Sequence, residues 1–143
     1  MIPWDKLHGA ITHFPIALLL FSTACDFVSI TLKKLSFARE LQSVSLYALA
    51  IAALASLGAV ISGIALSKGD MWGRGDFGWH HRFVWPGFGL LVALAVWRLV
   101  ERDAMSRFGL CIYLCLMLLA AGLIAAAGYF GGELLLSGGG VPS

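Results

Sequence analysis

The sequence predicts an all-α membrane protein, a single four-helix bundle that spans the bilayer. Of its 143 residues, 59% are hydrophobic and only 13% are charged, and the mean hydropathy is +0.87. Soluble domains hold about 45–50% apolar and about 25% charged residues, so this chain has too little polar surface to face water. The composition excludes a soluble globule, a disordered tail and a nucleic-acid-binding module. It predicts a chain whose partner is the lipid bilayer.

Four continuous apolar stretches predict the membrane-spanning helices, at about residues 11–32, 44–66, 80–100 and 108–131. Each has close to the ~20 residues that a helix, rising about 1.5 Å per residue, needs to cross ~30 Å of hydrocarbon. The stretches are continuous rather than alternating and are rich in Ala and Leu, which favours helices over strands. Because the connections are short, we expect residues 1–143 to form one domain.

The basic residues predict the orientation of the chain. Six of the ten Lys and Arg residues lie around the connections that follow the first and third spans, and four lie on the opposite side. Basic residues favour the cytoplasmic side of a membrane. The six-to-four bias therefore predicts that both termini lie on the periplasmic side of a bacterial inner membrane.

All four histidines fall at one predicted level of the membrane. His8 and His13 lie at the outer end of the first span, and His80 and His81 lie at the outer start of the third. Neutral imidazole is the usual axial ligand of haem iron and a common ligand of zinc and copper. In a bundle, side chains that point inward from facing helices hold such a cofactor. The alternative is a set of interfacial histidines that bind headgroups or carbonyls.

A haem between the first and third spans would need one imidazole from each. His13 is the better candidate on the first span, because it lies five residues, roughly 7.5 Å, deeper than His8. His80 and His81 point about 100° apart, so we expect only one of them to face inward. Arg82 could pair with the propionates of a haem, or could bind phosphate headgroups instead.

Three glycines of the fourth span lie at the level of the histidines: Gly128, Gly131 and Gly132. They could make room for a flat ring, or they could simply let two helices pack closely. The two halves of the chain also share one order of features, which is a histidine, a proline, a basic turn and a small-residue helix that ends in glycine. This order predicts a duplicated helical hairpin.

Asp26 is a lone carboxylate within the first span, roughly 9 Å from the inner boundary. A charge at that depth costs on the order of 1–3 kcal/mol unless it is paired or protonated. Two interpretations stay open. Asp26 either pairs with Arg98 or Arg102, or it exchanges protons with the cytoplasm.

A set of motifs spread over the whole chain carries a family resemblance. The set comprises Leu7-His8, His13-Phe14-Pro15-Ile16-Ala17-Leu18, Asp26, Gly69-Asp70, His81-Arg82 and Gly128-Tyr129-Phe130-Gly131-Gly132-Glu133-Leu134. With these motifs the chain resembles a bacterial family of four-span membrane proteins known only as a domain of unknown function. Gly9 departs from the pattern of that family, which has proline at this position.

That family resembles the membrane-embedded b-type cytochromes, and its domain is found fused to Rieske or c-type cytochrome domains. The resemblance implies electron transfer through haem b, with His13 and His81 as ligands and His8 and His80 as alternates. We therefore expect an electron-transfer subunit of an oxidoreductase complex rather than a complete enzyme. It would connect a quinol with other redox subunits or a periplasmic cytochrome, and a quinone is a second candidate cofactor.

Two rival functions stay open. The first is a cofactor-free structural or assembly subunit, in which the small residues serve only helix packing. The second is a metal or proton transporter that uses the histidines and Asp26 as successive stations. The transporter is disfavoured because the stretch between these stations, residues 16–24, offers only Ser22 and Thr23 as polar groups.

Overall fold

The computed structural model describes residues 4–32, 34, 36–102 and 105–136. Its helices are α1 (Trp4–Thr31), α2 (Ala38–Leu66), α3 (Gly75–Glu101) and α4 (Arg107–Leu136), and these residues contain no strand. All four helices are long and apolar enough to cross a membrane. The prediction of an all-α, four-span membrane protein is therefore confirmed.

Three helices begin earlier than the apolar stretches indicate, and α2 starts at Ala38, six residues before its predicted span. α1 starts at Trp4, seven residues before the predicted span, and α3 starts at Gly75, five residues before it. Hydropathy marks only the part of a helix that fits the hydrocarbon, whereas backbone hydrogen bonding continues through the flanking polar turns. Pro15 consequently lies inside α1, where it offers no N–H to the carbonyl of Ile11.

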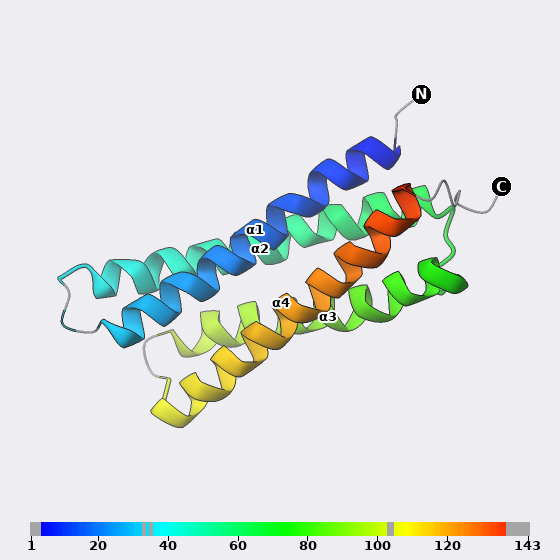
Figure 1. Cartoon of the computed structure of the whole chain (residues 1–143). Coiled ribbons are helices and arrows are strands. Elements are labelled where there is room, and N and C mark those ends of the chain that lie inside the picture. The colour runs from blue at the N-terminus through cyan, green and yellow to red at the C-terminus, as the bar shows by residue number, and fades with distance from the viewer. Residues whose placement is uncertain (1–3, 33, 35, 103–104, 137–143) are drawn as a thin grey trace.

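The four helices form two antiparallel hairpins, α1–α2 and α3–α4, which lie against one another (Figure 1). Within each hairpin the two helices pack extensively, and α2 with α3 and α1 with α4 make smaller contacts. The start of α1, the end of α4 and the α2–α3 connection lie at one end of the bundle. A duplicated helical hairpin would give this arrangement of two similar hairpins.

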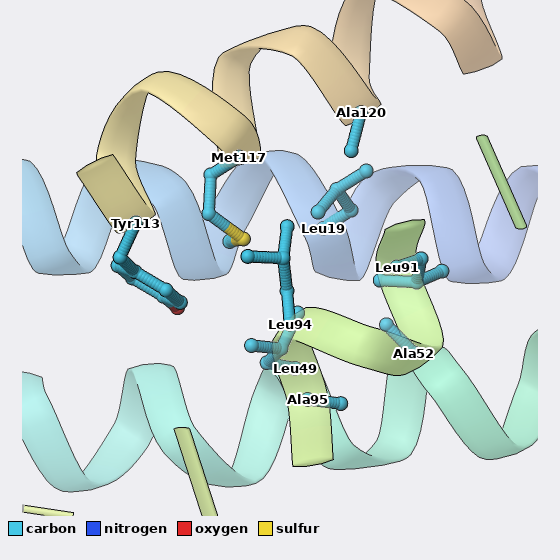
Figure 2. Close-up of a cluster of buried hydrophobic side chains, with 9 residues drawn as sticks. All are labelled: Leu19, Leu49, Ala52, Leu91, Leu94, Ala95, Tyr113, Met117 and Ala120. Carbon is cyan, nitrogen blue, oxygen red and sulfur yellow. The ribbon is translucent and has the colours of Figure 1, made fainter. Parts of the chain in front are cut away.

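A buried apolar cluster joins the hairpins at the middle of the bundle (Figure 2). All four helices contribute to it, through Leu19, Leu49, Ala52, Leu91, Leu94, Ala95, Tyr113, Met117 and Ala120. The outer surface is also apolar, as Leu54 is 67% exposed and Val100 is 75% exposed. An apolar outer surface is what helices that cross a lipid bilayer require. The histidines lie beyond one end of this cluster and Asp26 lies beyond the other.

Candidate functional site

A cavity lies at the end of the bundle where α1 and α3 begin. Its volume is about 320 Å³, at the small end of the ~300–1,000 Å³ of typical ligand sites. The four histidines of the chain line it, His8 and His13 from α1 and His80 and His81 from α3. Mostly apolar residues of all four helices complete the wall. The structure therefore brings together the histidines that the sequence places at one level, and we call this space the histidine cavity.

His8 is anchored to α2. Its Nδ1 lies 2.9 Å from the Oγ of Ser62, and that hydroxyl donates its only proton to the carbonyl of Ala59. With the hydroxyl donating to Ala59, Ser62 accepts a hydrogen bond from the Nδ1–H of His8, and this tautomer has its lone pair on Nε2. The ring also packs on Gly63, where a Cβ would lie 3.0 Å from the Cε1 of His8.

His80 has the corresponding arrangement in the second hairpin. Its Nδ1 lies 2.7 Å from the carbonyl oxygen of Ala127 in α4. A carbonyl only accepts, so Nδ1 carries the proton and Nε2 carries the lone pair. A Cβ at Gly131 would lie 3.1 Å from this Nδ1. Each hairpin thus holds one imidazole against a glycine of its second helix.

His13 and His81 are held differently. His13 is exposed, and its Nδ1 donates to the carbonyl of Gly9 in its own helix. His81 is 8% exposed and packs edge-on against Phe77, with ring centroids 4.4 Å apart. Within the described ranges, its buried Nδ1 has no hydrogen-bond partner. In the described part of the chain, no hydrogen bond at Nδ1 therefore fixes which ring nitrogen of His81 carries the proton.

The glycines of α4 reach the cavity as expected, since Gly128, Gly131 and Gly132 all line it. Of these three glycines, only Gly131 leaves room for a neighbouring side chain, which is the ring of His80. A Cβ at Gly128 or Gly132 would meet no atom within 4 Å. Glu133 is exposed, and no hydrogen bond links it to an imidazole among the residues that the structure describes.

Arg82 does not line the histidine cavity, and its role as a cofactor-binding residue stays a prediction. It lies in a separate groove, where its guanidinium carbon is 4.7 Å from the ring centroid of Trp79. The two spaces share no lining residue. The physical reason is helix phase. His81 points into the bundle, and the next side chain is turned by about 100° away from it.

Asp26 lies at the opposite end of the bundle, where the structure shows the pairing interpretation. Its Oδ1 is 3.7 Å from the Nη2 of Arg98, and its Oδ2 accepts a hydrogen bond of 3.0 Å from Tyr113. Arg98 also donates to the carbonyl of Arg102. The role of Tyr113 was not predicted, although a buried tyrosine hydroxyl usually has a hydrogen-bond partner. Proton exchange at Asp26 stays a prediction.

Across residues 4–32, 34, 36–102 and 105–136, no group of three or more His, Cys, Asp or Glu side chains is arranged to hold a metal ion. A structural zinc site needs four such ligands. Haem iron differs, because the macrocycle supplies four of its bonds and the protein adds one or two.

Comparison with known proteins supports the family resemblance. Residues 5–141 match the family described as "Predicted membrane protein (DUF2231)". No curated protein and no solved structure matches the chain. The expected resemblance to a four-span membrane family is thereby confirmed, and the likeness to b-type cytochromes stays an expectation.

Proposed function

The chain belongs to the DUF2231 family of predicted membrane proteins, and we propose that it is an electron-transfer subunit that holds haem b in the histidine cavity. It would lie in a bacterial inner membrane with both termini on the periplasmic side, and would pass electrons between a quinol and a periplasmic redox partner. One observation carries this proposal. Imidazoles from both hairpins meet in one mostly apolar cavity of a multi-pass membrane protein.

The hydrogen bonds around the cavity suit imidazoles that bind a metal. A ligating histidine usually donates its second ring N–H to a carbonyl, a carboxylate or water, which orients the ring and makes the other nitrogen more basic. The Nδ1 groups of His8 and His80 make bonds of this kind, to a hydroxyl and to a carbonyl. Their Nε2 lone pairs are left for a ligand. These hydrogen bonds support the proposal of a haem site.

His8 and His80 are the residues that would hold the haem iron. They come from different hairpins, and the second helix of each hairpin holds the ring in place. His13 and His81 become the alternates, in a reversal of the order that depth and resemblance favour. His13 is exposed and bonds only to its own helix, and the Nδ1 of His81 has no acceptor in the described part of the chain.

The remaining wall residues set the polarity of the site. Ile16, Val84, Leu91 and Ile124 line the cavity beside the histidines, so a bound group would be shielded from water on these sides. Haem b would supply one-electron transfer at a potential that depends on its axial ligands and on this polarity. The quinol and the redox partner are taken from the family resemblance.

Visible spectra of the chain, purified from haem-replete cells, test the proposal. We expect a Soret band and an α-band that change when dithionite reduces the oxidised protein. His8→Ala and His80→Ala should each remove or shift these bands. Thr12→Val, on the same cavity wall, should keep them. Circular dichroism and size-exclusion profiles like those of the wild type would show that each variant has folded.

Wild-type protein without haem bands would reject the proposal and would favour a cofactor-free structural or assembly subunit. Bands that survive in both single variants and in the double variant would reject the ligand assignment.

A further inference from the structure

A second groove lies at the histidine end of the bundle, between the α2–α3 connection and the first turns of α3. Its volume is about 290 Å³, and its lining is polar. Two arginines and two tryptophans contribute most of the side chains, namely Arg74, Arg82, Trp72 and Trp79. We call it the arginine groove. It is independent of the histidine cavity, because no residue lines both.

Neither arginine forms an ion pair in the described part of the chain, where the one ion pair joins Asp26 and Arg98. Asp70 is near enough to Arg74 for the two charges to interact, because backbone hydrogen bonds and, to a lesser degree, Arg74 lower the pKa of that carboxyl. The guanidinium of Arg82 lies over the ring of Trp79, 4.7 Å from its centroid. Such stacking fixes the plane of the guanidinium and leaves its N–H edge available. A guanidinium edge matches the oxygens of a phosphate and can donate two parallel hydrogen bonds to it.

Asp70, the acidic residue of the α2–α3 connection, already accepts hydrogen bonds from the backbone. The Oδ1 of Asp70 accepts hydrogen bonds from the backbone N–H groups of Trp72 (3.0 Å) and Gly73 (2.9 Å). These bonds lower the pKa of the Asp70 carboxyl, and the bond from Gly73 has the larger effect. The carboxylate thus shapes the turn, and in this turn it faces the backbone. Asp76, in the first turn of α3, is exposed and forms no ion pair in the described ranges.

Backbone groups add to the positive potential. α3 begins at Gly75, and no side-chain hydrogen bond caps its N-terminus at Arg74. The first N–H groups of a helix lack partners within the helix and carry a partial positive charge, which favours a bound anion. Here this N-terminus opens into the same groove as the two guanidinium groups.

Glycines allow the connection to lie directly on α3. Gly73 has a φ of +54°, and a Cβ there would lie 2.1 Å from Cδ1 of Phe77. A Cβ at Gly78 would lie 3.2 Å from the carbonyl oxygen of Gly73. Side chains at these positions would push the connection away from α3. The shape of the groove therefore depends on glycine at positions 73 and 78.

From these observations we propose that the arginine groove binds an anionic phosphate group. Trp72 and Trp79 are 73% and 46% exposed, and exposed tryptophans at a span end mark the depth of lipid headgroups. The phosphate of an anionic lipid is one source that would reach the groove at that depth, and a phosphate-bearing solute is the other. The shared chemistry is a phosphate held by Arg74 and Arg82.

Binding to the full chain, in nanodiscs of phosphatidylcholine, tests the proposal in two arms. The first arm adds phosphatidylglycerol to the nanodiscs and measures co-purified lipid by native mass spectrometry. The second arm titrates inorganic phosphate and follows the amide signals of residues 72–75 by nuclear magnetic resonance. The variant is Arg74→Gln with Arg82→Gln. The control is Arg39→Gln with Arg107→Gln, which removes the same charge at the other end of the bundle.

We expect the groove variant to lose about tenfold or more of the binding in at least one arm, because both charged donors to the phosphate are removed. The control should bind like the wild type. Loss in the first arm assigns the lipid as the source, and loss in the second assigns a free phosphate. Equal binding by variant, control and wild type in both arms would overturn the proposal. The haem spectrum plays no part in either arm.

Discussion

Asp26 of α1 and Arg98 of α3 form an ion pair that connects the two hairpins, with Oδ1 and Nη2 3.7 Å apart. Both residues are almost completely buried, at 2% and 5% exposure. Tyr113 of α4 donates to the other carboxylate oxygen at 3.0 Å. Three helices therefore meet at one carboxylate, at the end of the bundle opposite the histidines. A buried charge of this kind persists only when its partners are in place.

Removal of one member of this pair should destabilise the fold strongly. We expect Asp26→Ala to lower the free energy of unfolding by about 3–5 kcal/mol, because the charge of Arg98 is left buried and unpaired. The double variant Asp26→Leu with Arg98→Met should recover most of this loss. Denaturant unfolding in mild detergent, followed by circular dichroism, measures both. A double variant no more stable than the single one would contradict the importance of the pair.

The hydroxyl of Tyr113 should also contribute to stability. Tyr113→Phe keeps the ring in the core but removes a donor to Asp26, and a buried group that loses its partner costs about 1–3 kcal/mol. Tyr129→Phe is the matched control, since Tyr129 is 64% exposed, and it should change the free energy of unfolding by less than about 0.5 kcal/mol. Equal effects of the two substitutions would show that the hydrogen bond is unimportant.

The glycines behind the imidazoles should be needed for cofactor binding. An alanine at Gly63 or Gly131 would place a Cβ about 3 Å from the ring of His8 or His80, so that the ring must turn or move. We expect both variants to lose haem. Gly122→Ala should keep it, because a Cβ there meets nothing within 4 Å. The haem-to-protein ratio after purification measures this, and retained haem in Gly131→Ala would count against His80 as a ligand.

The turn after α2 should weaken in acid. Hydrogen bonds from Gly73 and Trp72 lower the pKa of Asp70 below its ordinary value of about 3.9. The contribution of Asp70 to the turn is therefore complete above that value, and it is lost as the pH falls through the lowered pKa. The amide proton shifts of Trp72 and Gly73 should report this titration. Asp70→Asn keeps an acceptor oxygen and should abolish the pH dependence; an unchanged titration would assign it to another group.

The orientation in the membrane can be tested by chemical labelling. In a variant without the three native cysteines, we expect Lys68→Cys to react with a membrane-impermeant maleimide in intact cells. Ser36→Cys should react only after the cells are opened. The reason is the bias of basic residues toward the side that carries Ser36. Labelling of Ser36→Cys in intact cells, with Lys68→Cys protected, would show that the chain has the opposite orientation.

The spans were predictable because lipid imposes a continuous apolar stretch on a helix, and no such constraint marks where the helix ends. The start of α1 at Trp4 was therefore missed. The gathering of the histidines was predictable as well. α1 and α3 run in the same direction through the membrane, so residues near their starts must share one end.

The details of the site were beyond the sequence. The nitrogen that each imidazole leaves free depends on its neighbours, such as Ser62 for His8 and Ala127 for His80. These contacts join positions far apart in the chain, and their register is set by hairpin packing. The turn of Arg82 away from the cavity depends likewise on the rotation of α3 about its axis.

Electron paramagnetic resonance of the oxidised, purified chain tests the central claim most directly, because the spin state of ferric haem reports its axial ligands. We predict a low-spin signal typical of two imidazoles, which His8→Ala and His80→Ala each convert to high spin, while Thr12→Val leaves it unchanged. A low-spin signal that survives both histidine substitutions, or no haem signal from the wild type, would contradict the claim.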